Sequence, residues 1–189
     1  ATLTGVPSND IVLKGLTALR NLDHRGAVGG EPDTGDGAGI LMQMPDRFLR
    51  GVAEFDLPEP GAYACGMAFL PVEPAAAAEA RASVEAMAAE EGLTVLGWRE
   101  VPVNPEILGS MSRGAMPSFA LLFVTAGGDA PRTGIELDRI AFALRKRAEH
   151  ELEVYFPSLS SRTLVYKGML TTEQLEGFFP DLGDERMES

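Results

Sequence analysis

The spacing of apolar residues along the chain predicts alternating helices and strands. Apolar side chains recur every three or four positions across residues 10–22, which is typical of an amphipathic helix. Asp10 is the expected N-cap of this helix, and Gly26 lies just beyond its end, where a left-handed C-cap often falls. The apolar run 40–44 predicts a short buried strand, and residues 46–51 favour one helical turn.

The region from residue 61 to residue 167 predicts strand, helix, strand, strand, helix and strand in turn. The expected strands are 63–70, 95–101, 119–125 and 162–166, and the expected helices are 74–91 and 135–152. This order is the split βαβ pattern of ferredoxin-like modules, although many α+β domains share it. The sequence therefore predicts an α+β fold with a ferredoxin-like subregion over 61–167.

Glycine and proline positions mark the breaks between these elements. Pro-Glu-Pro-Gly at 58–61 predicts a subdomain boundary, and three prolines within 102–117 predict a loop. Gly97 suggests a bulge within its strand. Thr171 and Gln174 have the spacing of a capping box, which predicts a final short helix.

Charge and composition exclude several classes of function. The 189 residues carry a net charge of −12, which argues against a nucleic-acid partner because such partners are bound through Lys and Arg clusters. No apolar run approaches the roughly 20 residues that cross a bilayer, so no membrane association is expected. A single cysteine, Cys65, excludes an internal disulfide and suits a reducing compartment, and we expect a cytoplasmic protein.

A glycine-rich stretch between residues 26 and 40 is the most informative part of the chain. Its spacing fails the dinucleotide pattern G-x-G-x-x-G, since Ile40 and Met42 stand where glycines are needed. Its acidic residues also fail the calcium-loop pattern. The two histidines lack a second ligand at zinc spacing, so no metal site is predicted. The stretch either lines a site or forms a tight structural loop.

Two side chains, those of Arg25 and Cys65, are candidates for a chemical role. Arg25 directly precedes Gly26 at an expected chain reversal, where its guanidinium could hold loop carbonyls or a carboxylate. From its position in a loop alone, a structural role for this pair is favoured over a functional one. Cys65 lies in an apolar strand, which predicts a core residue, since a catalytic thiol needs a cationic and partly exposed setting.

Two blocks of sequence resemble the N-terminal class II glutamine amidotransferase domain of the glutamate synthase large subunit. The first covers residues 10–45 and includes Asn21-Leu22-Asp23-His24-Arg25-Gly26-Ala27 and Thr34-Gly35-Asp36-Gly37-Ala38-Gly39-Ile40-Leu41. The second includes Arg145-Lys146-Arg147-Ala148-Glu149, Tyr155-Phe156-Pro157-Ser158-Leu159-Ser160 and Tyr166-Lys167-Gly168-Met169-Leu170. The blocks occur in family order, so residues 1–189 are expected to form part of one such domain.

The resemblance implies a fold and a reaction. The fold is the four-layer αββα sandwich of N-terminal nucleophile hydrolases, here incomplete, with the split βαβ-like region inserted in it. The reaction releases ammonia from glutamine for transfer to 2-oxoglutarate in glutamate biosynthesis. The resemblance implies no cofactor in this segment, and a flavin (FMN) and an iron–sulfur cluster in downstream domains. The remaining domains of the large subunit and a possible small subunit are the implied partners, with glutamine as substrate.

The family also implies roles for individual residues. An Arg-Gly pair at the place of Arg25 and Gly26 lies beside the catalytic cysteine and steadies its surroundings, and Asp36 and Gly37 belong to the neighbouring substrate-binding loop. The family's N-terminal Cys-Gly start and its downstream His-Ser-Arg-Phe and Asn-Gly motifs are not matched in this sequence. We therefore expect the segment to be inert alone, because acyl transfer needs a nucleophile and oxyanion donors.

Two alternatives stay open at this point. The order of elements over 61–167 is also compatible with a complete, non-catalytic α/β module that binds a small ligand or a protein partner. Cys65 could in principle act as a substitute nucleophile, although no activating neighbour is visible. The role of Lys167-Gly168-Met169 is not assigned by either reading.

Overall fold

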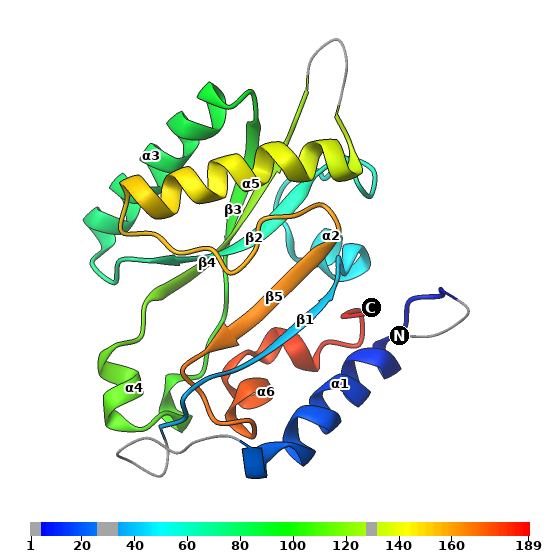
Figure 1. Cartoon of the computed structure of the whole chain (residues 1–189), viewed down its shortest axis with the longest axis vertical. Coiled ribbons are helices and arrows are strands. Elements are labelled where there is room, and N and C mark those ends of the chain that lie inside the picture. Colours follow the sequence, from blue (N-terminus) through cyan, green and yellow to red (C-terminus); the bar gives the residue numbers. More distant parts are fainter. Residues whose placement is uncertain (1–4, 26–33, 128–131) are drawn as a thin grey trace. The chain divides into compact units, whose positions relative to one another are not determined.

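The computed structural model describes residues 5–25, 34–127 and 132–189, whose helices and strands are labelled in Figure 1. These residues fall into two compact units. Unit 1 comprises Ala1–Phe48, Val101–Met116 and Val165–Ser189, and unit 2 comprises Leu49–Glu100 and Pro117–Leu164. Each unit is therefore assembled from segments that are far apart in the sequence.

Unit 2 is built on a three-stranded antiparallel sheet. Its strands are β2 (Ala64–Leu70), β4 (Ser118–Thr125) and β3 (Thr94–Glu100), in the spatial order β2-β4-β3. The register of β3 shifts between Val95 and Gly97, which confirms the bulge predicted at Gly97. A side chain at residue 97 would overlap the ring of Phe55, so the glycine makes room for that ring, which packs against Phe123 with the ring centroids 5.2 Å apart.

The free edge of β2 is covered by the segment that precedes β5. Backbone hydrogen bonds join Phe69 to Tyr155 (2.8 and 3.2 Å) and Cys65 to Ser160 (2.9 and 3.2 Å). The strand expected at 162–166 is β5 (Thr163–Gly168), and it pairs with β1 instead of joining this sheet. Periodicity placed this strand along the chain but did not indicate its partner.

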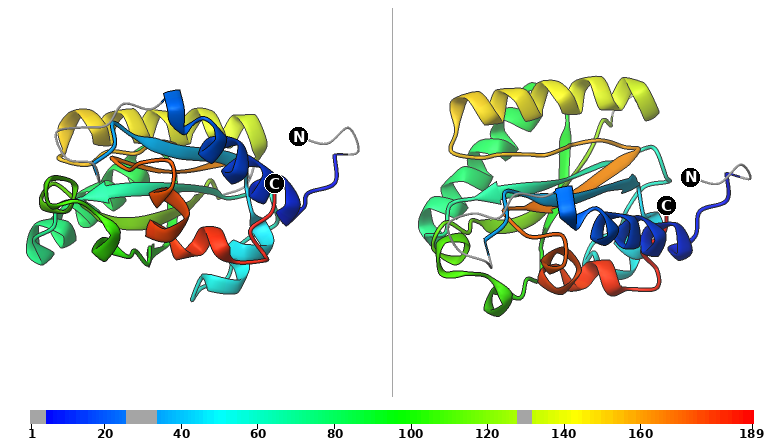
Figure 2. Two further views of the ribbon diagram at one scale, coloured as in Figure 1. Left: turned by 90° about the horizontal axis from the view of Figure 1, so that it is seen from below. Right: turned by 60° about the horizontal axis from the view of Figure 1, so that its bottom comes forward.

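Two long helices cover one face of the sheet, as the views in Figure 2 show for α3 (Pro74–Glu90) and α5 (Gly134–Glu151). Pro74 occupies the first turn of α3, and the Glu73 carboxylate caps that turn by accepting a hydrogen bond from Ala76 N (2.7 Å). Gly92, with φ +77°, follows the helix end, where glycine is common. Small side chains let both helices approach the sheet closely. The buried core between them includes Ala77, Ala80, Val84, Leu137, Ala141, Leu144, Ala64, Ala68 and Leu122.

Unit 1 contains helix α1 (Asn9–Asn21), the 3₁₀ turn η1 (Asp23–Arg25) and strand β1 (Ala38–Gln43), which pairs with β5. The predicted caps of α1 were wrong. The N-cap is Ser8, because the backbone of Ser8 is held extended by two hydrogen bonds to Ser189 (3.1 and 3.3 Å). The helix ends at Asn21 with Leu22 as C-cap, so it stops before Gly26.

The remaining elements of unit 1 are short. The proline-containing stretch 102–117 is not only a loop, because it forms η2 (Pro105–Ile107) and α4 (Ser110–Gly114); the Asn104 side chain caps η2 through Glu106 N (3.3 Å). Helix α2 (Asp46–Val52) confirms the predicted turn and runs from unit 1 into unit 2. The chain closes with α6 (Gln174–Phe178) and η3 (Pro180–Gly183). Gln174 Oε1 accepts from Thr171 N (2.9 Å), as a capping box requires.

Candidate functional site

The glycine loop, residues 34–39, lies directly against the β5 end, residues 166–172. A Cβ at Gly35 would overlap the carbonyl group of Leu170 and approach Thr171 N to 2.6 Å. A Cβ at Gly39 would lie 2.6 Å from Lys167 Cβ. Gly35 meets Leu170 whereas Gly39 meets Lys167, so the two segments run in opposite directions, as the arrows of β1 and β5 show in Figure 1. The glycines are therefore required by a close contact between main chains.

Gly37 is required for a different reason. Its φ is +135°, a conformation that residues with a side chain rarely adopt. Space is not the constraint there, since a Cβ would lie 3.7 Å from the carbonyl oxygen of Gly168. The turn at Gly37 thus sets the direction in which the chain enters β1.

The glycine loop presents one charged side chain to solvent. Asp36 and Gly37 are exposed, whereas Thr34, Gly35 and Ala38 on either side of them are buried. A carboxylate that is displayed in this way on a fixed backbone is open to a ligand. The substrate-binding role of Asp36 and Gly37 stays a prediction.

The predicted Arg25–Gly26 pair follows α1. Arg25 is the last residue of η1, and Gly26 lies outside the described residues. The structure therefore shows where the turn before Gly26 begins but does not test the role of the pair.

Lys167-Gly168-Met169, which the sequence left without a role, lies within the β5 end. The β5 end is the surface on which the glycine loop packs. Two hydrogen bonds hold it in place: Ser112 Oγ of α4 donates to the carbonyl oxygen of Met169 (3.1 Å), and Tyr166 OH donates to buried Asp181 (2.8 Å). The sequence marked both segments as important, because both lie in the blocks that resemble the family. The spacing of residues alone does not indicate that the two segments contact each other.

Cys65 has none of the features of a nucleophile. Its side chain is fully buried on β2, and burial raises the pKa of the thiol far above its usual value, with Arg99 opposing this only weakly. The thiolate is the reactive form of cysteine, so Cys65 is a core residue, as predicted.

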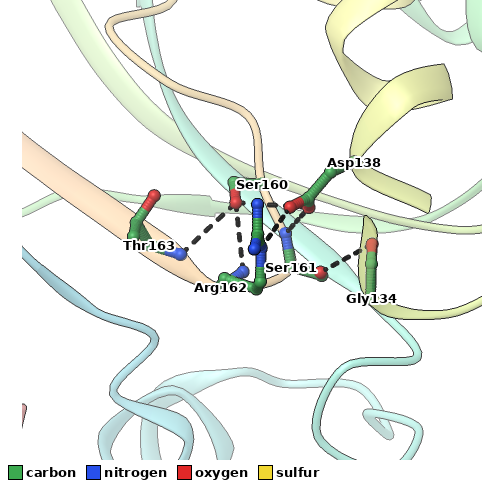
Figure 3. Close-up of polar contacts among 6 residues, drawn as sticks. All are labelled: Gly134, Asp138, Ser160, Ser161, Arg162 and Thr163. Carbon is green, nitrogen blue, oxygen red and sulfur yellow. Dashed lines mark hydrogen bonds and ion pairs between the residues drawn. The ribbon is translucent and has the colours of Figure 1, made fainter. Parts of the chain in front are cut away.

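A second polar cluster joins α5 to the segment before β5 in unit 2 (Figure 3). Asp138 accepts hydrogen bonds from Ser161 N (2.6 Å), Ser160 Oγ (3.2 Å) and Arg162 Nε (2.7 Å). Burial raises the pKa of the Asp138 carboxyl, but the Ser161 and Arg162 hydrogen bonds lower it more, so the net pKa lies below its usual value. Figure 3 shows the Ser160 hydroxyl and the Ser161 main-chain N–H directed at the Asp138 carboxylate, while the Ser161 hydroxyl donates to the carbonyl oxygen of Gly134 (3.2 Å). These contacts fasten α5 to this segment.

Metal ligands do not gather in the described part of the chain: no three His, Cys, Asp or Glu side chains within it come close enough to hold an ion. Nor does any helix among residues 5–25, 34–127 and 132–189 have the length and apolar character needed to cross a membrane.

Residues 1–189 match the family model of class II glutamine amidotransferases, and the chain belongs to that family. It is 41% identical over 191 residues to the large chain of NADPH glutamate synthase from Bacillus subtilis, covering 98% of this chain and 12% of the relative. It is 39% identical over 202 residues to ferredoxin-dependent glutamate synthase 1 from Arabidopsis thaliana, covering 100% and 12%. A ferredoxin-dependent glutamate synthase 2 from Synechocystis is 38% identical over 187 residues, covering 96% and 12%.

These matches confirm the resemblance of the chain to the large subunit of glutamate synthases. The chain spans about an eighth of the length of the curated relatives it matches (12% of each).

Proposed function

We propose that this chain forms part of the glutaminase domain of a glutamate synthase, which releases ammonia from glutamine for transfer to 2-oxoglutarate. The observation that carries the proposal is the contact between the glycine loop and the β5 end. These two segments belong to the sequence blocks shared with the family, lie more than a hundred residues apart, and meet through glycines that leave no room for a side chain.

Within this proposal the glycine loop and the turn at Arg25 form one wall of the glutamine site. Arg25 and Gly26 steady the surroundings of the nucleophile, and the exposed Asp36 and Gly37 contact the substrate. A loop held by main-chain packing suits this task, because a site group must keep its position to within a fraction of an ångström.

We further propose that the chain contributes to the four-layer αββα sandwich of N-terminal nucleophile hydrolases. Two properties of unit 2 support this. Its sheet carries α3 and α5 on one face, and the side chains of the opposite face, such as Met67, Leu121 and Phe123, are also buried. A sheet that is apolar and buried on both faces is typical of an internal layer.

The nucleophile of the proposed reaction is not Cys65. The class uses an N-terminal cysteine whose α-amino group serves as base, and Cys65, the sole cysteine of the 189 residues, is buried within β2. We therefore propose that these residues alone do not hydrolyse glutamine. A flavin and an iron–sulfur cluster, further domains of the large subunit and a small subunit would belong to the complete cytoplasmic enzyme.

Ammonia release from glutamine by the purified chain tests the proposal. We expect none above background from the 189 residues. We expect activity when the family's Cys-Gly start and its His-Ser-Arg-Phe and Asn-Gly motifs are added, and none when the added cysteine is replaced by alanine. Ammonia release by the 189 residues would place the nucleophile within them and contradict the account of Cys65. Failure of the extended chain, if folded, would contradict the proposed function.

A further inference from the structure

The turn that ends in Arg25 is tied to the segment after β5 by side-chain contacts. Thr172 Oγ1 donates a hydrogen bond to Asp23 Oδ1 at 2.6 Å. One turn earlier on α1, Arg20 forms an ion pair with Glu176 of α6 (2.5 Å). Residues 172–176 thus hold the end of α1 and the first residue of η1 at two points.

The same segment also holds the glycine loop. Gly35 packs against Leu170 and Thr171, immediately before Thr172. The backbone there is fixed in turn, because Thr171 N donates to Gln174 Oε1 (2.9 Å) and Gln174 Nε2 donates to the carbonyl oxygen of Ile107 (2.9 Å). Two parts of the proposed site, separated in sequence by residues 26–33, therefore share one rigid support in unit 1.

We propose that Thr172 is a positioning residue, which sets the Asp23–Arg25 turn at a fixed place relative to the glycine loop. The turn η1 is only three residues long, so anchoring the carboxylate of its first residue restrains the backbone of the whole turn. This inference rests on the proposed function, since the position of the turn matters for catalysis only if Arg25 and Gly26 border the nucleophile.

Thr172 carries this role better than the neighbouring ion pair. The side chains of Arg20 and Glu176 are 43% and 38% exposed, and ion pairs of that kind contribute little to stability. The Thr172–Asp23 hydrogen bond is exposed too, but it acts on the turn itself, and a hydrogen bond to a charged acceptor is stronger than a neutral one.

The test compares three substitutions in the full-length protein. Thr172→Val removes the hydroxyl and keeps the shape, Thr172→Ser keeps the hydroxyl, and Thr94→Val removes an exposed threonine hydroxyl at the start of β3 in unit 2. Amide hydrogen exchange at residues 23–25 reports whether the Thr172–Asp23 hydrogen bond (the tether) holds the turn, and glutamine hydrolysis reports its effect on activity. Asp23→Asn alone and combined with Thr172→Val completes a double-mutant cycle.

We expect Thr172→Val to speed exchange at residues 23–25 and to lower kcat by about three- to tenfold, the effect of losing one such hydrogen bond. KM should stay within about twofold, since the loss concerns the nucleophile's surroundings and not substrate affinity. Thr172→Ser and Thr94→Val should leave both readouts near the wild-type values. Once Asp23→Asn is present, Thr172→Val should add little, so the double variant should be no slower than Asp23→Asn alone.

Each contrary result has its own meaning. Unchanged exchange in Thr172→Val overturns the tether. Faster exchange with unchanged kcat overturns the positioning role, and an equal loss in Thr94→Val or Thr172→Ser overturns it as well. A wild-type protein that never hydrolyses glutamine contradicts the proposed function instead, and hydrogen exchange then decides the tether by itself.

Discussion

Gly35→Ala should destabilise the chain more than any other alanine substitution in the glycine loop. The added methyl group would overlap the carbonyl group of Leu170 and lie 2.6 Å from Thr171 N. All of these atoms belong to main chain, so relief requires a backbone shift and not a rotamer change. Overpacking of this kind costs about 1–3 kcal/mol, and the rigid partner places Gly35→Ala near the upper end.

The matched control is Gly183→Ala. Gly183 also lies in unit 1, its φ is not positive, and a Cβ there meets no atom within 4 Å. That substitution should be neutral or slightly stabilising, because alanine restricts the unfolded chain.

Urea denaturation of the 189-residue chain followed by circular dichroism measures the difference. We expect Gly35→Ala to lower the unfolding free energy by about 3 kcal/mol with an unchanged m-value, and to lower Tm by about 6–12 °C. A Gly35→Ala chain as stable as Gly183→Ala would refute the close contact between the glycine loop and the β5 end.

Three further predictions follow from the described contacts. Cys65 should resist thiol reagents near neutral pH in the folded chain and react promptly in urea, because burial keeps its thiol protonated; rapid labelling without denaturant would contradict this. Tyr166→Phe should cost about 1–3 kcal/mol in urea denaturation, since it removes a donor from the buried Asp181 carboxylate; a neutral effect would show that this hydrogen bond contributes nothing. The pKa of Asp138 is lowered in the folded chain, so its carboxylate stabilises the fold above its ordinary pKa and loses that contribution as pH falls through its pKa in the folded chain. The wild type should therefore lose stability more steeply than Asp138→Asn between about pH 5 and 2. Parallel pH profiles of the two proteins would contradict a stabilising role for the Asp138 hydrogen bonds.

Local chemistry allowed much of unit 2 to be predicted from the sequence. The order of β2, α3, β3, β4 and α5 followed from periodicity, and the bulge at Gly97 followed from the glycine inside a strand pattern. The cover on the edge of β2 was missed, because Tyr155 and Ser160 form isolated bridges in a segment without alternation.

Unit 1 was harder to predict because long-range contacts determine its details. The N-cap of α1 is set by Ser8 pairing with Ser189, a residue at the other end of the sequence, which no local signal indicates. The glycine-rich stretch stands out in the sequence, but its partner does not, since the pairing of β1 with β5 depends on main chain and not on complementary side chains.

Because backbone meets backbone at glycines 35 and 39, the outward side chains of the β5 end are free to vary while the number of residues is not. Met169, 61% exposed, illustrates that freedom. Inserting or deleting one residue in either segment would bring a side chain to a place that admits none. Relatives of this chain should therefore tolerate exchanges at such positions far more readily than any change of length between residues 35 and 39 or between 166 and 170.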